Sequence, residues 1–370
     1  MSDTKVPVYF VDTRSDAKSN IFGKIQKLIK AVELTDKIPQ RALVALKIHF
    51  GERGNTGFLR PSYVTPFVEA AKAAGALPFV TDCNTLYVGS RAESVSHMMT
   101  AHDHGFTPDA IGAPVIIADG LRGDNVATVP ISGDMYDKVT IGAEIVKSDF
   151  LICLTHFKGH ELTGFGGAIK NLGMGCAGRD GKLDQHSDVS PKVKQKTCIG
   201  CGRCKLFCPA GAITLDKTAT INPEICIGCG QCILTCPNGS IRIVWNSSTE
   251  MFQKKMAEYS LGVVEGKRDV SVFFNFIITV TPQCDCHNFS DAPIVGDIGV
   301  LASTDPVAID QASADLVNRA SGIVGTALTT NLEPGQDKFR GLYPHIDWSV
   351  QLSHGEKVGL GTRKYELFEL

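Results

Sequence analysis

Apolar and polar residues along the chain form short blocks that predict alternating strands and helices. Runs rich in apolar and β-branched residues read as strands at residues 6–11, 43–49, 77–82, 115–119, 149–155, 270–280 and 298–302. Helical spacing of apolar residues follows the first run, from Ile21 to Val32, where Ser19 or Asn20 is placed to cap the helix.

Three further helices are expected from the same pattern. One begins at Pro61 and stops at Gly75, one covers residues 249–264, and one follows Asp305 and Pro306. Strands that alternate with helices in this way are typical of an α/β fold with a mainly parallel sheet.

Composition and charge exclude several classes of protein. The 370 residues are 43% hydrophobic and 21% charged, which is typical of a globular chain and not of collagen-like, mucin-like or disordered ones. The net charge of −2 gives no support for binding of nucleic acid or of anionic lipid by the whole protein. The apolar run at 270–280 is shorter than the roughly 20 residues of a membrane span, so no membrane insertion is expected. The first ten residues lack the pattern of a signal peptide, which predicts a cytoplasmic protein.

Thirteen cysteines point to metal or redox chemistry, because cytosolic thiols are kept reduced and rarely form disulfides. Eight of them fall between residues 198 and 236, in two runs that are offset by 28 residues. The sequence Cys-Ile-Gly-Cys-Gly occurs at 198 and again at 226, so the segment is an internal two-fold repeat.

Each run has the spacing C-x2-C-x2-C-x3-C-P of bacterial ferredoxins with two 4Fe-4S clusters, in which the fourth cysteine of each run binds the other cluster. The predicted ligands of the first cluster are Cys198, Cys201, Cys204 and Cys236, and those of the second are Cys226, Cys229, Cys232 and Cys208. A pair of zinc sites is the alternative, but structural zinc has no use for the third and fourth cysteines at this spacing.

The cysteine runs also set the predicted domain organisation. Residues 1–190 and 246–370 are expected to form one discontinuous α/β host domain, interrupted by a ferredoxin-like α+β insertion at 191–245. A tandem of three domains is the alternative, but neither flank has a Pro-rich or Ser-rich linker.

The expected insertion carries seven basic and two acidic side chains, and each oxidised cluster with its thiolates would subtract about two charges. The lysines at 192, 194 and 196 either solvate a linker or help to form a docking face for an acidic redox partner. Partners of this kind include a ferredoxin, a flavodoxin or a larger redox enzyme.

A second candidate site lies between residues 156 and 186, at the expected carboxyl end of a strand, where open α/β sheets form ligand crevices. Gly164, Gly166 and Gly167 lead into a helix whose amides, with Lys170, are predicted to bind a cofactor or a small anionic ligand; close packing is the other explanation for the glycines. His156 and His160 are four residues apart, as on one helical face, and with Lys170 they are the predicted catalytic residues.

Two other polar groups have open interpretations. Cys284, Cys286 and His287 either bind a soft metal, provide a redox thiol pair, or are structural residues beside a turn. Residues 47–53, which include Lys47, His49, Glu52 and Arg53, either face the same crevice or form a solvated loop.

Several segments outside the cysteine runs resemble the ferredoxin-fused members of domain-of-unknown-function family 362. They lie at 47–55, 154–171, 284–287 and 305–310. The resemblance implies an iron-sulfur protein with an α/β host domain and brings no substrate. The spacing of His160, Lys170 and His186 is in addition similar to that of the cofactor-bearing lysine and its flanking histidines in nickel-pincer lactate racemases.

Three functions remain open from the sequence. The first is an oxidoreductase that carries single electrons through two 4Fe-4S clusters to a substrate or cofactor in the host domain. The second is a non-catalytic electron carrier or an assembly protein for a larger redox enzyme. The third is a racemase-like metal-cofactor enzyme with structural clusters.

Overall fold

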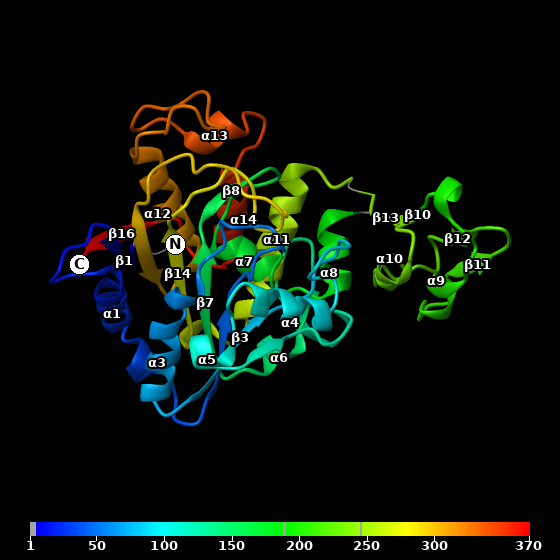
Figure 1. Cartoon of the computed structure of the whole chain (residues 1–370), viewed down its shortest axis with the longest axis horizontal. Helices are drawn as coiled ribbons and strands as arrows, with labels where there is room; N and C mark the ends of the chain where they lie inside the picture. Colours follow the sequence, from blue (N-terminus) through cyan, green and yellow to red (C-terminus); the bar gives the residue numbers. More distant parts are fainter. Residues whose placement is uncertain (1–4, 188–189, 245) are drawn as a thin grey trace.

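The computed structural model describes residues 5–187, 190–244 and 246–370, and its centre is an eight-stranded sheet with helices on both faces (Figure 1). Residues 1–4, 188–189 and 245 lie outside the described part; residue 245 is the last residue of the expected insertion. In spatial order the strands are β16 (Tyr365–Glu369), β1 (Val6–Asp12), β15 (Gly299–Ser303), β14 (Ser271–Ile277), β7 (Phe150–His156), β2 (Leu43–Lys47), β3 (Leu77–Asp82) and β4 (Val115–Ile117).

The sheet is mainly parallel, which confirms the α/β host fold expected from the sequence. Only β15 runs against its two neighbours, β1 and β14, while every other pair in this sheet is parallel. Strands β14 and β15 are joined by residues 278–298, which stay at the carboxyl end of β14 and return the chain in the opposite direction.

Both faces of the sheet are buried, which explains the nearly continuous apolar runs. Along β14, Phe273 and Phe274 point into different hydrophobic clusters on opposite faces, and both are buried. One face is covered by α1 (Ile21–Ala31), α2 (Leu34–Lys37), α3 (Thr65–Ala73), α4 (Ser94–Asp103) and α5 (Pro108–Ile111). The other is covered by α7 (Ala168–Gly173), α11 (Thr249–Val264), α12 (Pro306–Arg319), α13 (Lys338–Leu342) and α14 (Ser349–Lys357).

The expected helices are confirmed, together with their caps. The side chain of Asn20 accepts a hydrogen bond from the Gly23 amide at the start of α1, and Asp305 caps α12 in the same way. The helix expected from Pro61 is a short 3-10 turn, Pro61–Tyr63, followed by α3, and Gly75 lies just beyond it with a φ of +75°. Smaller elements of this part are β5 (Val126–Pro130), β6 (Lys138–Gly142), α6 (Ala143–Lys147) and α8 (Arg179–His186).

The helical face predicted for His156 and His160 is wrong, because this stretch is extended. His156 is the last residue of β7, and Lys158–His160 forms β8, which pairs with β9 (Gly164–Gly166). A Cβ atom on Gly159 would lie 2.2 Å from the carbonyl oxygen of Pro282, so this hairpin packs directly against the loop after β14.

Residues 190–244, called the cysteine-rich segment below, lie at one edge of the molecule beyond α8 (Figure 1). They form two small antiparallel sheets, β10 (Lys192–Val193) with β13 (Ile241–Arg242) and β11 (Ile213–Leu215) with β12 (Ala219–Ile221). The helices α9 (Arg203–Leu206) and α10 (Gln231–Thr235) occupy equivalent positions in the two repeats. Within the described ranges, we find no helix with the length and apolarity of a membrane span.

Apolar and polar contacts attach the cysteine-rich segment to the rest of the protein. Leu86 and Leu183 pack into the same hydrophobic cluster as Ile233 of α10. The side-chain amide of Gln231 donates to Asp124 at 3.2 Å. These contacts place the second half of the segment against the sheet domain.

Candidate functional site

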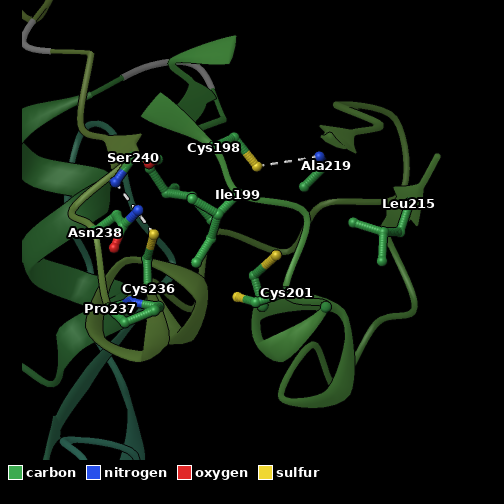
Figure 2. A pocket seen from close by; sticks show the side chains of 12 residues that line it. Cys198, Ile199, Cys201, Leu215, Ala219, Cys236, Pro237, Asn238 and Ser240 are labelled. Carbon is green, nitrogen blue, oxygen red and sulfur yellow. Dashed lines mark hydrogen bonds between the residues drawn. The ribbon is translucent and has the colours of Figure 1, made fainter. Parts of the chain in front are cut away.

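The eight cysteines of the two runs form two groups of four, and each group surrounds its own small cavity. Cys198, Cys201, Cys204 and Cys236 line the first cavity, and Figure 2 shows Cys198 and Cys201 on one loop and Cys236 on another. Cys208, Cys226, Cys229 and Cys232 line the second cavity. The structure therefore brings the thiols together in the crossed combination expected from the sequence.

Backbone amides point at the sulfur atoms of these groups. The amide of Ser240 donates to Cys236 Sγ at 3.1 Å, and that of Ala212 donates to Cys208 Sγ at 3.3 Å. Burial raises the pKa of the Cys236 thiol, but hydrogen bonds from the amides of Ser240, Asn238 and Ile241 outweigh burial and lower it. Thiolates that accept N–H bonds are the donor set of an iron-sulfur cluster, so the residues fit that group.

Two glycines allow the loops to close around these cavities. At Gly200, with a φ of +65°, a Cβ atom would lie 2.5 Å from the carbonyl oxygen of Lys217. At Gly230, with a φ of +67°, it would lie 3.0 Å from the Arg179 side chain and 3.4 Å from Leu86. In the described chain, no three His, Cys, Asp or Glu side chains are grouped as they would be around a single metal ion.

The two thiol groups differ in their surroundings. The first cavity is lined by residues of the cysteine-rich segment alone, and Cys201 and Ile199 beside it are exposed. The second group lies near the sheet domain, because Gly230 and Cys232 pack beside Leu86. The first group is therefore the outer one and the second is the inner one.

A cavity of about 450 Å³, called the central cavity below, lies at the carboxyl ends of β2, β3 and β7. This confirms the expected position of the segment from 156 to 186, since parallel sheets form ligand crevices at this edge. Its walls include His49, Asp82, Leu86, Tyr87, Arg91, His156, Lys158, His160, Gly166, Gly167, Lys170, Lys182, His186, Cys286 and His287.

His156 is held by its own protein at both ring nitrogens. Its Nδ1 lies 2.9 Å from the Asp285 carboxylate, and its Nε2 lies 2.9 Å from the carbonyl oxygen of Ile278. Asp285 also pairs with Lys158 at 3.5 Å. Since both ring nitrogens face acceptors, His156 fixes the loop after β14 and has no nitrogen left for a substrate.

His160 and Lys170 lie on the same wall of the central cavity. The Nδ1 of His160 accepts a hydrogen bond from the Leu162 amide at 3.2 Å, which leaves the hydrogen on Nε2. Burial and the nearby Lys170 ammonium lower the pKa of His160 to about 4, so the ring is neutral at pH 7. The Nζ of Lys170 donates to Cys284 Sγ at 3.3 Å.

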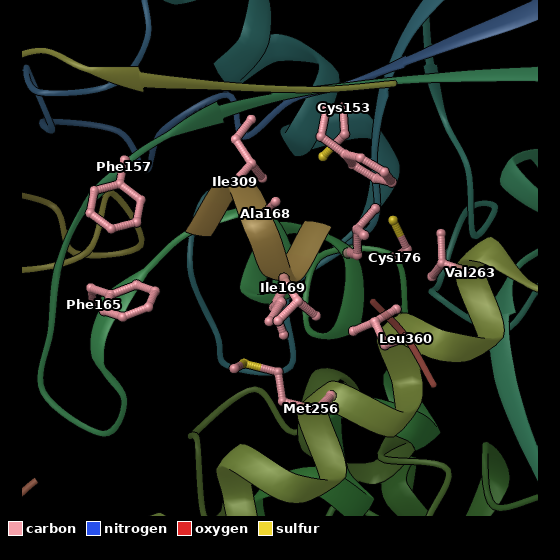
Figure 3. Packing of buried hydrophobic residues seen from close by; sticks show 14 of the residues in the cluster. Cys153, Phe157, Phe165, Ala168, Ile169, Cys176, Met256, Val263, Ile309 and Leu360 are labelled. Atoms are coloured by element: carbon pink, nitrogen blue, oxygen red, sulfur yellow. The ribbon is translucent and has the colours of Figure 1, made fainter. Parts of the chain in front are cut away.

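The helix that carries Lys170 does not offer its first amides to a ligand. The amides of Ala168 and Ile169 donate to the Asp310 carboxylate at 2.7 and 2.9 Å, so a side chain of α12 occupies the expected anion cradle. Figure 3 shows Ala168 and Ile169 packed among Phe165, Ile309 and Met256.

The three predicted cofactor-binding glycines fall into different surroundings. Gly166 and Gly167 line the central cavity, whereas a Cβ atom on Gly164 would lie 2.6 Å from Trp348. Gly167 also approaches Asp310 closely, with 2.2 Å between an added Cβ and its Oδ1. Close packing therefore accounts for Gly164 and Gly167, and a cofactor-binding role for these glycines stays a prediction.

His186, on α8, completes a histidine-lysine-histidine wall with His160 and Lys170. Its ring stacks on Phe252 with 4.5 Å between centroids. Burial, together with the neighbouring His160 and Lys170, lowers the pKa of His186 to about 3.

Some of residues 47–53 face the central cavity and others are solvated, so each of the two interpretations holds for part of this segment. His49 lines the central cavity, and Lys47 is fully buried beneath it, where it pairs with Asp82 at 2.9 Å. Glu52 is buried and accepts a hydrogen bond from the Ser90 amide at 2.7 Å. Arg53 is solvated, with 59% of its side chain exposed.

Asp82, Tyr87 and Arg91 are among the cavity residues that the sequence reasoning missed, as are Lys158 and Lys182. Arg91 is fully buried, its Nη1 lies 3.5 Å from Asp82, and its Nη2 donates to the Tyr87 hydroxyl at 2.7 Å. The Tyr87 hydroxyl donates in turn to the carbonyl oxygen of Cys286 at 3.0 Å. Asp82 could have been identified as a site residue from its position at the end of a predicted strand. Tyr87 and Arg91 could not, because they lie in a loop without any motif.

Comparisons with known proteins identify one family and distant structural likenesses. A family model described as Domain of unknown function (DUF362) matches residues 44–315, which is more than half of the chain. None of the curated proteins matches the sequence significantly.

Two solved structures are similar to parts of the chain. The lactate racemase apoprotein from Thermoanaerobacterium thermosaccharolyticum has 11% sequence identity and a TM-score of 0.36, over 75% of this chain and 52% of that one. A structural-genomics protein from Thermotoga maritima has 8% identity and a TM-score of 0.38, over 90% of this chain and 58% of that one. The chain thus covers little more than half of either protein, and both TM-scores are too low to assign an activity.

Proposed function

The chain belongs to the DUF362 family, whose name assigns no reaction, and we propose that it is an iron-sulfur oxidoreductase. Single electrons would pass through two 4Fe-4S clusters to a small anionic substrate or cofactor in the central cavity. The observation that carries this proposal is the grouping of eight thiols into two crossed sets of four. When bound, clusters at these positions would supply the electrons.

The placement of the two thiol groups supports electron flow from the outer group through the inner group to the central cavity. Leu86 belongs both to the hydrophobic cluster around Cys232 and to the wall of the central cavity. Leu86 also lies beside Gly230, which lines the inner thiol cavity, so this side chain lies between the inner group and the central cavity. The outer group faces solvent at Cys201 and suits exchange with an external partner.

An acidic partner of the ferredoxin or flavodoxin class is the electron donor that the outer surface favours. Ile199 and Leu206 expose 64% and 79% of their surface there. Lys196, Arg203 and Lys205 are exposed in the same stretch of chain. Apolar contacts surrounded by positive charge suit a transient complex with an acidic protein, whose encounter is steered by charge.

Within the central cavity, the chain's own residues can bind and orient an anion. The ammonium groups of Lys158 and Lys170 supply positive charge, and the Nε2 hydrogen of neutral His160 supplies a directed hydrogen bond. Lys170 stays charged, because burial lowers its pKa but the negative charges of Cys284, Cys286 and Glu161 outweigh burial and raise it.

Metal analysis and cluster reoxidation test the proposal together. We expect about eight iron and eight sulfide per chain in anaerobically purified protein. Reduced clusters should be reoxidised by one member of a panel of small anionic oxidants without a second protein. Stoichiometric zinc without sulfide would overturn the assignment.

Variants of the cavity separate binding from folding. Lys170→Ala and His160→Ala should keep both clusters and the melting temperature but slow the reoxidation. Lys254→Ala, on the exposed side of α11, is the control and should change neither. Reoxidation at the wild-type rate in both cavity variants would exclude these residues from the site.

A racemase-like metal-cofactor enzyme is the second candidate, and the observation that favours it is the wall formed by His160, Lys170 and His186. Such an enzyme would interconvert the enantiomers of a small chiral acid while its clusters stay oxidised and no electron donor is present. Turnover under those conditions, together with an added mass on Lys170, would replace the first proposal.

A further inference from the structure

Two cysteines of the loop after β14 lie side by side at the central cavity. Cys284 Sγ accepts hydrogen bonds from the Cys286 amide at 3.4 Å and from Lys170 Nζ at 3.3 Å. The two thiols are close enough to influence each other's ionisation. Cys286 lines the cavity, while Cys284 is buried behind it with 1% of its surface exposed.

We propose that Cys284 and Cys286 alternate between a thiol-thiolate pair and an intramolecular disulfide, and that they reduce a small anionic disulfide in the central cavity. This inference rests on the proposed function for its electrons, which reach the pair from the inner cluster site.

The reaction balances with one substrate disulfide and two electrons. In the first half, the Cys286 thiol passes its proton to the Cys284 thiolate, Cys286 Sγ attacks one substrate sulfur and the substrate S–S bond breaks, so that a mixed disulfide forms and one substrate half leaves as a thiolate. Cys284 Sγ then gives that proton to the second half as it attacks Cys286 Sγ, which releases the second half as a thiol and forms the Cys284–Cys286 bond. The two halves leave as one thiol and one thiolate, because the pair held one proton at the start.

In the second half, two electrons and one proton restore the pair. The electrons break the Cys284–Cys286 bond, and an acidic iron-sulfur or flavin protein is their source outside the chain. The proton comes from solvent at the rim of the cavity, where 37% of the His287 side chain is exposed. One sulfur regains the proton and the other stays a thiolate beside Lys170.

Electrostatics near the pair favours a thiolate at Cys284. The hydrogen bond from Cys286 lowers the pKa of Cys284, and although burial acts against this, the charges of Lys170 and Lys158 lower it further. The pKa of Cys286 is raised because its thiol donates that hydrogen bond. The same two ammonium groups oppose a bound metal cation, so the pair fits redox chemistry better than a soft-metal site.

A short stretch of chain joins the pair to the inner thiol group. Leu86 lies beside Gly230, which lines the inner thiol cavity, and the next residue, Tyr87, donates its hydroxyl hydrogen to the carbonyl oxygen of Cys286 at 3.0 Å. Two consecutive residues therefore connect the edge of the inner cavity with the loop that carries the pair, which gives a compact route for electrons.

The test uses anaerobic holoprotein that has been oxidised with diamide. Photochemically reduced ferredoxin is the donor and glutathione disulfide is the probe substrate. Free thiols are blocked with iodoacetamide at each step, and the peptide containing residues 284–286 is read by mass spectrometry. We expect a disulfide after diamide, two alkylated cysteines after the donor, and a disulfide again after the probe.

Matched variants locate the reaction. Cys284→Ser and Cys286→Ser should each abolish the disulfide, whereas Cys153→Ser, a buried cysteine of β7, should leave the cycle intact. If diamide forms no bond between Cys284 and Cys286, the inference is overturned whatever the clusters do.

The remaining outcomes separate this inference from the function on which it rests. Clusters that accept electrons while the pair stays oxidised would overturn the inference and leave the proposed function standing. Clusters that accept no electrons from ferredoxin would overturn the proposed function and the electron route together. If glutathione disulfide fails to oxidise the pair, small anionic disulfides are excluded as the substrate class.

Discussion

Replacing Lys170 should suppress the reactivity of Cys284, because the Lys170 ammonium lies 3.3 Å from its sulfur. Lys170→Met keeps much of the side-chain volume and removes the charge. A hydrogen bond to a charged group contributes about 1.5–3 kcal/mol, which corresponds to a factor of about 10 to 100 in an equilibrium. The ionisation constant of Cys284 should therefore fall about 10- to 100-fold, which moves the whole labelling profile to higher pH.

The assay is the pH dependence of iodoacetamide labelling of the reduced pair, followed by mass spectrometry at residue 284. Because the pKa of Cys284 is depressed, labelling in the native protein should persist well below the ordinary thiol range, and in Lys170→Met it should require a higher pH. Lys182→Met is the matched control: Lys182 is also buried at the central cavity, but its Nζ donates to the Ala177 carbonyl. Equal labelling profiles in folded Lys170→Met and native protein would refute the reasoning.

Three further predictions concern stability and cluster assembly. Asp310→Ala leaves two buried amides and the Asn275 side chain without their acceptor, so it should lower the free energy of unfolding by about 3–6 kcal/mol in chemical denaturation. Asp315→Ala, at a less buried position of α12, should lower it by about 1 kcal/mol, and equal losses would contradict the capping role. Burial raises the pKa of Asp285, but His156 and Lys158 outweigh burial and lower it, so its contribution to stability is present above about pH 4 and lost as the pH falls further. The stability difference between Asp285→Asn and native protein should accordingly shrink in acid, and a constant difference would count against the pairing. Cys208→Ser should expose the thiols of the second run to alkylation and Cys236→Ser those of the first, whereas damage confined to the substituted run would exclude the crossed ligation.

The sheet was predictable because a strand that is buried on both faces has apolar residues at nearly every position. Strand β14 is buried at every position, so its apolar run stands out. The reversed direction of β15 was not predictable in the same way, because it depends on where the connection at 278–298 runs. Periodicity reports which face of an element is buried and carries no information on strand direction.

The candidate site was predictable only where its residues are close in sequence. The spacing of the cysteines led to the grouping that the structure shows, since neighbouring ligands lie within one loop. The anion cradle was misjudged because its amides are satisfied by Asp310, which lies 142 residues after Ala168. A four-residue spacing likewise suggested a helix for His156 and His160, while the close approach of Gly159 to Pro282 holds this stretch extended.

The position of the cysteine-rich segment in the chain affects the order in which the protein is made. Strand β14 fills the gap between β7 and β15 in the sheet, yet it is synthesised only after residues 190–244. During translation the ribosome therefore releases all eight cysteines of the runs while the edge of β7 is still unpaired. An open strand edge is prone to aggregation, so this interval is when a chaperone would be needed. It is also the first opportunity for iron and sulfide delivery, since all eight thiols have then left the ribosome.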